Sequence, residues 1–383
     1  MKKIRITLLV LLIFILISTT GCWNYREIDK LAIVAGVAVD KGINNQLQVT
    51  VEIIQISGSK DTNMTSKTIT VEGKTMFDAA RNIISLSGKK LYWSHAKIII
   101  LSEEIASEGV TKILDWYNRD SETREDVRIL ISKGASAKEI FKGQGTTENI
   151  KSFVLDDMMK GQESLGKAPI IDLLKLYIES KTEGISTIIP TINLKKMDEK
   201  MIPQIMGTAI IKNDKLVGYL NGEETRVLTF IRNEVKGGLF IVEMQENDVT
   251  NLVSLEIFKS KTKVKPVVES EDIEVKINID TTVSLDETQG TDTIFEEEGL
   301  SVLEQSAANA LREQIEALIK KVQSEYGADI FGFGEKLRED EIKVWNSVGN
   351  HWEEVFENLK VNVNTSFHIK NSAVLSNSTQ ESD

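Results

Sequence analysis

Few side chains of this 383-residue sequence stand in a pattern that could carry out catalysis. Ser57 and Lys60 have the Ser-x-x-Lys spacing of a serine nucleophile with a lysine base, but the Lys-Thr-Gly motif that accompanies it in acyl-serine enzymes does not follow. Gly332 and Gly334 stand two positions apart, yet they do not begin the full Gly-x-Gly-x-x-Gly pattern of a dinucleotide-binding loop. These absences disfavour catalysis, and we expect the chain not to be an enzyme.

The residues that bind metals are also sparse. His95, His351 and His368 are far apart in the sequence, and one cysteine allows neither a thiolate cluster nor an intrachain disulfide. The acidic run Glu296–Glu298 lacks the spacing of an EF-hand loop. We therefore expect no metal and no cofactor. A pair of carboxylates suited to glycoside hydrolysis stays open, because 58 acidic residues allow many combinations.

The single cysteine, Cys22, follows a segment typical of a signal peptide. The apolar run Ile6–Ile17 follows basic residues and is 12 residues long, whereas a membrane-spanning helix needs about 20. The sequence Ser-Thr-Thr-Gly-Cys at 18–22 resembles a bacterial lipobox, although Thr19 stands where leucine is usual. In a lipobox the cysteine thiol takes a diacylglycerol group, and cleavage leaves it as the first residue. We predict a lipoprotein signal peptide at 1–21 and lipidation of Cys22; the alternative is an unmodified thiol.

Composition and charge narrow the class of protein further. Hydrophobic residues make up 41% and charged residues 27%, which is ordinary for a globular protein. The net charge of −12 argues against a nucleic-acid partner, since binding phosphate requires a basic surface. The same charge does not favour adhesion to anionic lipid, so the acyl anchor would have to attach the chain to a membrane.

Hydrophobic periodicity predicts an α+β fold with several domains, mixed sheets and packed helices. Residues 22–135 alternate strands with helices and form an N-terminal α/β domain. Residues 136–200 form a helical lobe with a return strand. Residues 201–371 form a C-terminal α+β domain with an antiparallel sheet and one long helix over 300–326, and 372–383 are a disordered tail. The predicted strands are 31–40, 46–56, 68–72, 97–101, 127–132, 184–194, 204–212, 215–220, 239–244, 253–264, 273–285 and 361–369.

The order of motifs resembles one protein family along nearly the whole chain after the signal peptide. Cys-Trp-Asn-Tyr-Arg-Glu-Ile at 22–28, leading into 34–40, and the glycine-bearing segments 207–211, 215–224 and 329–334 are similar to the Ger(x)C family. That family comprises the lipoprotein C subunits of nutrient germinant receptors in spore-forming bacteria. The candidate structural or partner-contacting signature residues are Gly207, Gly218, Gly222, Glu224, Asp329, Gly332, Gly334, Trp345 and Trp352.

The signature residues have structural interpretations beside the partner-contacting one. Glycines allow turns and close approach of backbones. Asp329 is expected to cap the turn that ends the long helix. Trp345 and Trp352 are seven residues apart, but Gly349 is expected to interrupt the helix between them, and we expect both indoles in the core rather than on a partner-facing surface.

The resemblance implies a function that the residues alone do not. It implies a multi-domain α+β lipoprotein on the outer face of the inner spore membrane, associated with integral membrane A and B subunits that trigger germination. It transfers no catalytic residue, and whether the chain itself contacts a small-molecule nutrient stays open. The alternative is a solute-binding lipoprotein of an importer, which would have two similar lobes around a cleft.

Overall fold

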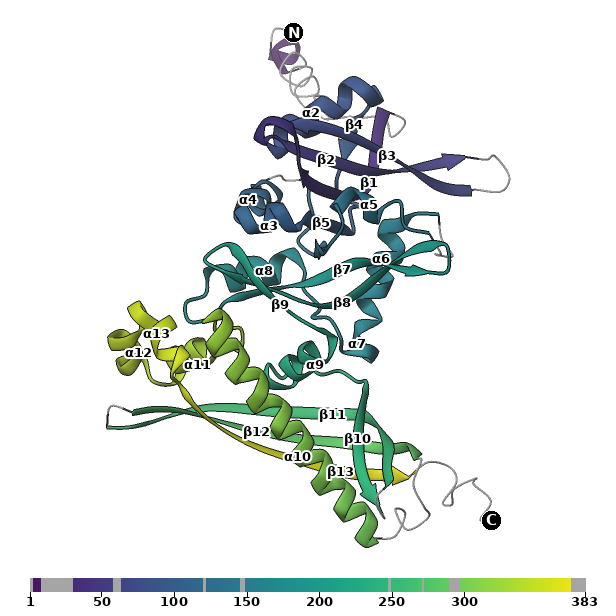
Figure 1. Cartoon of the computed structure of the whole chain (residues 1–383). Helices are drawn as coiled ribbons and strands as arrows, with labels where there is room; N and C mark the ends of the chain where they lie inside the picture. The colour runs from purple at the N-terminus through teal and green to yellow at the C-terminus, as the bar shows by residue number, and fades with distance from the viewer. Residues whose placement is uncertain are drawn as a thin grey trace.

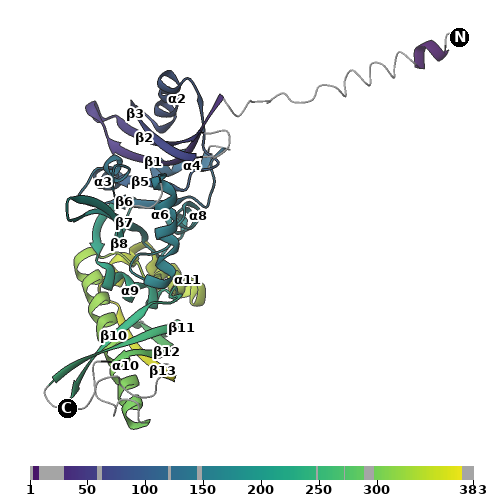
Figure 2. The same ribbon diagram turned by 90° about the vertical axis from the view of Figure 1, so that its right-hand side faces the viewer.

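The computed structural model describes residues 3–7, 30–57, 63–119, 122–144, 149–246, 249–270, 272–288 and 297–372. Cys22 and the predicted tail from residue 373 on lie outside these residues, while Ser372 ends the last strand. Two sheets and the helix α9 (Gly222–Ile231) follow one another along the long axis of the molecule (Figures 1 and 2). The fold is therefore mixed α and β with two sheets, as the sequence predicts.

The first sheet has nine strands, in the order β3-β2-β1-β5-β6-β7-β8-β9, with β4 paired to β1. β1 is apolar along almost its whole length because it lies in the middle and is covered on both faces. β1, β2 and β3 form an antiparallel meander, whereas β5 and β6 run parallel to β1. The strands are β1 (Leu31–Lys41), β2 (Leu47–Ser57), β3 (Asn63–Gly73), β4 (Lys90–Tyr92), β5 (Ile98–Ser102), β6 (Arg128–Ser132), β7 (Thr187–Met197), β8 (Lys200–Lys212) and β9 (Lys215–Leu220).

Helices cover both faces of this sheet. Successive residues of β5 belong to different apolar clusters, since Ile99 lies in the main core and Ile100 packs with α5 and α6 on the opposite face. Gly109, whose φ of 136° no helix adopts, separates the helices α3 and α4. These helices are α2 (Met76–Ser87), α3 (Glu103–Glu108), α4 (Thr111–Arg119), α5 (Ala137–Ile140), α6 (Lys151–Lys160), α7 (Gln162–Leu165) and α8 (Leu173–Lys181).

Two buried carboxylates of the sheet hold the first turns of α5 and α6. The Asp40 carboxylate accepts the backbone N–H groups of Ala137 and Lys138 at 2.7 and 2.9 Å. Glu52, which is 1% exposed, accepts the N–H groups of Lys151 and Ser152, each at 2.8 Å. Helix N-termini leave N–H groups without partners inside the helix, so these carboxylates satisfy donors that would otherwise be buried unpaired.

The first sheet continues beyond residue 200, where a domain boundary is predicted. β7 pairs parallel with β6 and antiparallel with β8, and β9 completes the hairpin. The predicted boundary thus falls in the turn between β7 and β8. The helices predicted as a separate lobe lie against this sheet, with α6 over β5.

The second sheet has four strands, in the order β10-β11-β12-β13. The predicted antiparallel arrangement is correct for β10, β11 and β12 but wrong for β13, which runs parallel to β12. The long helix α10 carries the chain back along the sheet, so β13 starts beside the beginning of β12, at Glu274. The elements are β10 (Leu239–Glu246), β11 (Val249–Glu269), β12 (Asp272–Thr288), α10 (Glu297–Lys321) and β13 (Lys360–Ser372).

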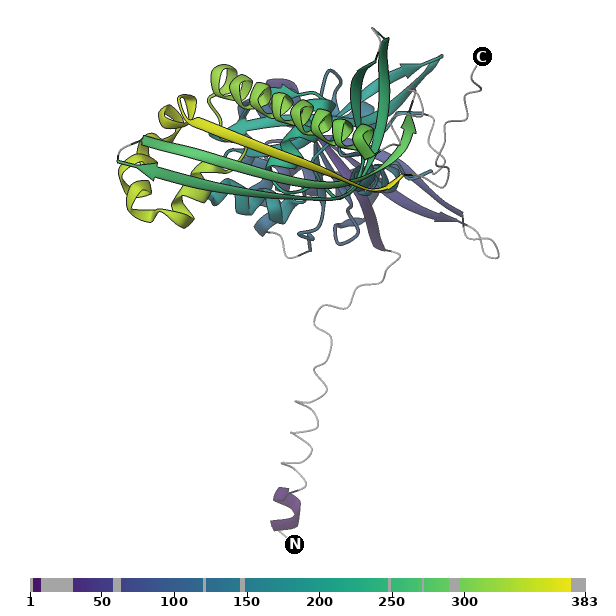
Figure 3. The ribbon, with the colours of Figure 1, turned by 90° about the horizontal axis from the view of Figure 1, so that it is seen from below.

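α10 lies across one face of the second sheet (Figure 3) and buries a stripe of apolar residues that includes Leu303, Leu311 and Ile315. It continues into a π-helical turn, Val322–Tyr326, and ends at Gly327 in the left-handed conformation. Three short helices follow: α11 (Phe333–Asp340), α12 (Ile342–Val348) and α13 (Trp352–Glu357). None of the helices within the described ranges combines the length and the apolar character that crossing a bilayer requires.

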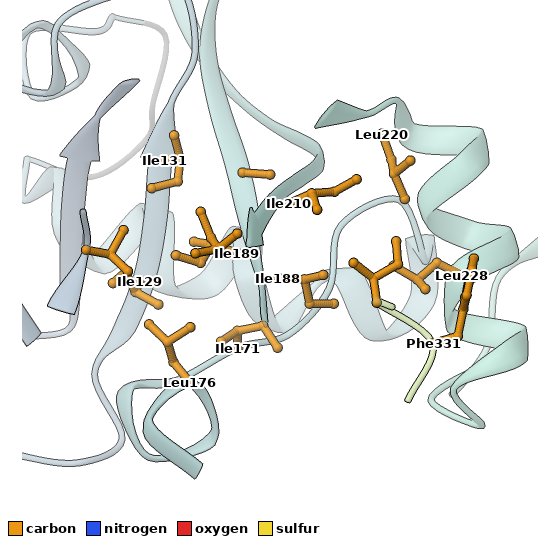
Figure 4. Close-up of a cluster of buried hydrophobic side chains, with 14 of the residues drawn as sticks. Ile129, Ile131, Ile171, Leu176, Ile188, Ile189, Ile210, Leu220, Leu228 and Phe331 are labelled. Carbon is orange, nitrogen blue, oxygen red and sulfur yellow. The ribbon is translucent and has the colours of Figure 1, made fainter. Parts of the chain in front are cut away.

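A continuous apolar core joins the two sheets. Ile188 and Ile210 of the first sheet face Leu228 of α9 and Phe331 of the loop before α11 (Figure 4). The same cluster extends into the face of the second sheet that α10 covers. The two sheets are therefore not independent bodies on a free linker.

We predict that Glu52→Ala lowers the free energy of unfolding by about 2–3 kcal/mol, because it leaves the N-terminal N–H groups of α6 buried without an acceptor. Urea unfolding measures this change. The control is Glu72→Ala, whose half-buried carboxylate accepts one long hydrogen bond of 3.3 Å from Ile43. Equal effects of the two substitutions would contradict the capping role of Glu52.

Candidate functional site

The late signature residues meet around the carboxylate of Asp329, which is 4% exposed. This side chain lies in the loop between the π-helical turn and α11. Five N–H groups point at its two oxygens and no cation pairs with it among the described residues. Oδ1 accepts the backbone N–H groups of Phe331 (3.1 Å), Gly332 (2.9 Å) and Phe333 (3.2 Å); Oδ2 accepts those of Gly334 (2.8 Å) and of the Trp352 indole (3.0 Å).

The electrostatics of Asp329 follow from this burial. Loss of hydration raises the pKa of its carboxyl to about 6, and the surrounding N–H groups oppose that rise. The expected capping role is shifted along the chain: the carboxylate binds the N–H groups that begin α11 rather than the turn that ends α10. Gly332 adopts φ of 81°, which lets the loop wrap around one oxygen.

Backbone hydrogen bonds connect the loop that holds Asp329 to the segment just before β7 of the first sheet. The Asp329 carbonyl accepts the N–H of Ser186 at 2.7 Å, just before β7. The Gly184 carbonyl accepts the N–H of Glu335 at 3.1 Å, and the two glycine backbones at 184 and 334 are in direct contact. A Cβ on Gly334 would also lie 2.5 Å from Nε1 of Trp352. Glycine is therefore required at both positions of this contact.

We call this arrangement the joint, meaning residues 184–186, residues 329–335 and Trp352. Sequence reasoning placed Gly184 only at the start of a strand and missed its part in the joint. The available signal was a glycine in a short polar turn directly before an apolar strand, which often marks close approach of another backbone.

The two tryptophans of the signature lie in the core. Trp345 and Trp352 are each 6% exposed, and their rings contact at 5.6 Å between centroids. α12 ends before Gly349, and a 3₁₀ turn separates it from α13, as the sequence predicts. A Cβ on Gly349 would lie 2.8 Å from the Trp345 indole, so this glycine permits the ring to pack over the turn.

Two signature residues that come earlier in the sequence, Gly218 and Glu224, contact the C-terminal end of α10 and the π-helical turn that follows it. Gly218 of β9 is covered by the ring of Tyr326, which leaves no room for a Cβ. The Tyr326 hydroxyl donates to the Tyr219 carbonyl at 3.2 Å. Glu224 forms a capping box with Asn221 at the start of α9 and an ion pair of 2.7 Å with Lys321 of α10.

The two signature glycines not yet described, Gly207 in β8 and Gly222 at the start of α9, leave room for neighbouring groups to approach the backbone closely. Gly207 has φ of 96°, and a Cβ there would lie 2.6 Å from the Leu220 carbonyl oxygen. A Cβ on Gly222 would lie 2.8 Å from Cγ of Met206. The nine signature residues thus form two clusters, both at the junction between the first sheet and the C-terminal elements.

A cavity of about 790 Å³ lies beside the joint, between α8, the β8–β9 turn and α13. Such a volume is typical of a small-molecule site. Among the described residues that line it there is no lysine or arginine. Six carboxylates line it: Glu179, Glu183, Asp214, Asp329, Glu353 and Glu354.

A buried ion-pair network includes Glu179, one of the residues that line the cavity. Arg232, buried at the end of α9, pairs with Glu179 and with Glu234, and also donates to the Ile330 carbonyl at 3.3 Å. Burial raises the pKa of Glu179, and the charges of Arg232 and Lys175 oppose the rise. Glu179 Oε2 is buried without a hydrogen-bond donor within the described part of the chain.

These groups do not form a catalytic constellation. Every described hydrogen bond of the Asp329 carboxylate comes from the protein's own N–H groups, which leaves it unsuited to transfer a proton. No cluster of three metal-ligating side chains occurs in the residues that the structure describes. What the geometry does provide is a rigid joint next to an acidic cavity.

Comparison with known proteins identifies the family. A model of the "spore germination protein N-terminal domain" matches residues 24–194, and a model of "spore germination B3/GerAC like, C-terminal" matches residues 206–373. This chain belongs to the Ger(x)C family. The resemblance inferred from the motifs is therefore confirmed, and membership gives the chain a role in spore germination.

Relatives of this Ger(x)C protein match along its whole length. Spore germination protein B3 of Bacillus subtilis (strain 168) is 28% identical over 370 residues, covering 94% of this chain and 96% of the relative. Spore germination protein KC of the same strain is 22% identical and covers 97% and 96%. The crystal structure of the GerBC protein has a TM-score of 0.60 at 23% identity, covering 88% of this chain and 97% of that one, which shows the shared fold.

We predict that Asp329→Asn lowers the free energy of unfolding by about 3 kcal/mol, because an amide NH₂ would face buried N–H donors. The control is Asp340→Asn, which changes an exposed carboxylate that pairs with Lys336 and is expected to alter stability by less than about 0.5 kcal/mol. Chemical denaturation measures both. A change at Asp329 no larger than the control would contradict its role in the joint.

A second substitution tests the backbone contact. We expect Gly184→Ala to cost at least about 2 kcal/mol more than Gly88→Ala, because both glycines have positive φ but only Gly184 touches another backbone. Gly88 has open space where the Cβ would be. Thermal unfolding compares the two variants, and similar melting temperatures would show that residues 184 and 334 are not in contact.

Proposed function

We propose that this Ger(x)C protein is a non-enzymatic lipoprotein subunit of a spore nutrient germinant receptor, assembled with two integral membrane subunits, A and B. The main observation that supports this proposal is that both family models match the chain in order, over residues 24–194 and 206–373. The membership covers both sheets and the joint, so the whole described body belongs to the proposed subunit.

The proposal includes attachment through Cys22 to the outer face of the inner spore membrane. Cys22 lies eight residues before Lys30, the first residue of the folded body that the structure describes. Two or more acyl chains at this cysteine would anchor the body stably, whereas a single chain would bind only marginally. The absence of a spanning helix among the described residues is compatible with such an anchor.

The signature residues support a scaffolding role better than a partner-contacting one. Asp329, Trp345 and Trp352 are each 6% exposed or less. We therefore propose that they fix the angle between the two sheets, while exposed residues contact the other subunits. The exposed carboxylates Glu183 and Glu354 on the rim of the acidic cavity are suited to meet a cationic group of such a partner.

The alternative, a solute-binding lipoprotein of an importer, requires two similar lobes. The two sheets described here differ in strand number, topology and helix cover. The acidic cavity is the one observation that favours binding of a small molecule, and it lies at the joint rather than between matched lobes.

Co-purification from native spores tests the proposed function. We expect the tagged chain, extracted from spore membranes with detergent, to bring down two multi-span proteins in a fixed ratio, and we expect the Cys22→Ala variant to be lost from the membrane fraction. Mass spectrometry identifies the partners and the acylated N-terminal peptide. Recovery of the chain alone, or with importer components, would refute the receptor assignment.

A further inference from the structure

A second, smaller pocket lies at the end of the first sheet where the described body begins. It has a volume of about 300 Å³ and is formed by α2, β4, the residues after β4 and α4. Its lining combines apolar and charged side chains. Apolar groups come from Phe77, Ala80, Ile84, Leu91, Trp93 and Trp116, and charged groups from Arg81, Lys90, Arg119 and Glu122.

One buried polar atom of a lining residue has no hydrogen-bond partner among the described residues. The Nε1–H of Trp116 is buried and donates to no acceptor there. The Trp116 side chain is held in place by edge contacts with Trp93 and Tyr117, at centroid distances of 4.8 and 4.6 Å. Buried N–H groups are nearly always satisfied, so this indole points to an acceptor from outside the described residues.

The charge of the pocket is opposite to that of the protein. Three basic side chains and one carboxylate line it, in a chain of net charge −12. Lys90 pairs with Glu122 at 2.5 Å, and Arg119 pairs with Asp115 at 2.7 Å. Arg81 is exposed and lies over the ring of Phe77, 5.3 Å from its centroid. Arg81 has no ion pair among the described residues, so this lining cation suits the pocket to an anionic group attached to an apolar body.

The position of the pocket identifies the source of such a group. Leu31, the first residue of β1, is the strand partner of Lys90 on the pocket lining. Cys22 lies eight positions before Lys30, and an extended chain spans at most about 3.6 Å per residue, or roughly 30 Å in all. If Cys22 carries the anchor, as the proposed function holds, this pocket lies within that distance of the lipid surface.

We infer that the pocket formed by Phe77, Arg81, Lys90, Trp93, Trp116 and Arg119 binds an anionic phospholipid of the leaflet that holds the anchor. The lipid phosphate lies against the guanidinium and ammonium groups, and the glycerol and first acyl carbons lie on the indoles. An oxygen of the lipid ester or phosphate accepts the N–H of Trp116. Tryptophan is the residue suited to this depth of the interface.

This binding would fix the orientation of the body on the membrane. An acyl tether alone lets the body rotate, whereas a second contact at α2 and α4 sets the first sheet next to the bilayer. The second sheet, at the opposite end of the molecule, then points away from the membrane (Figures 1 and 2).

The experiment uses the mature chain from residue 22 on, with Cys22→Ser so that no acyl chain contributes. Co-sedimentation compares vesicles of phosphatidylcholine with vesicles that contain phosphatidylglycerol. We expect binding to the anionic vesicles that is at least tenfold stronger and that weakens as salt is raised. Phospholipids brominated near the glycerol should quench tryptophan fluorescence, and Trp116→Phe should reduce that quenching and the affinity together.

The control for charge is a basic residue on the distant sheet. Arg81→Glu should weaken binding to anionic vesicles by roughly tenfold, since it removes a positive charge near the anionic surface and places a negative charge there. Lys259→Glu, an exposed substitution on β11, should leave binding unchanged. Equal loss in both variants, or equal binding to neutral and anionic vesicles, would overturn the inference.

Two further outcomes are distinguishable. If inorganic phosphate at millimolar concentration displaces the chain from the vesicles as effectively as soluble short-chain phosphatidylglycerol does, the pocket recognises free phosphate and the lipid assignment is wrong. If the N-terminal peptide from native spores carries no acyl group, the proposed anchor fails, while the vesicle measurement on the Cys22→Ser chain still decides the pocket.

Discussion

Within the described residues, the carboxylate of Asp329 is buried without a counter-ion and is stabilised by five N–H groups. Those donors come from the loop before α11, from the start of α11 and from the indole of α13. A buried carboxylate that lost them would be strongly unfavourable, so the loop, α11 and α13 have one arrangement in which the charge is satisfied. Because the Asp329 carbonyl also binds Ser186, that arrangement sets where β7 begins, and through β7 the position of the first sheet.

Other contacts at the junction complement this interaction. On one side the core is apolar, with Ile188, Leu228 and Phe331 packed between the sheets (Figure 4). On another side Arg232 joins α8, α9 and the loop before α11 through a buried ion-pair network. Networks of this kind specify one geometry more than they add stability. The joint therefore suits a subunit whose task is to hold two surfaces at a fixed angle within a larger assembly.

Local features of this fold were predictable from the sequence, whereas long-range ones were not. The long helix over 300–326 and the interruption at Gly349 depend on residues a few positions apart, and both are seen. The direction of β13 depends on the path of the chain through four helices, which no periodicity in β13 reports. The continuation of the first sheet through β8 and β9 likewise depends on pairing with β7. The position of Trp345 and Trp352 in the core was predicted, but the contacts of Trp352 with Asp329 and Gly334 were not, since those contacts span about twenty residues.

Hydrogen exchange followed by mass spectrometry tests the dependence of the joint on Asp329 most directly. If the account is right, amides at 184–186, 331–335 and in α13 are protected together in the wild-type protein and lose protection together in Asp329→Asn, while β1 and β5 keep theirs. Protection at 184–186 that is unchanged in the variant would show that the first sheet does not depend on this carboxylate, and the account of the joint would be wrong.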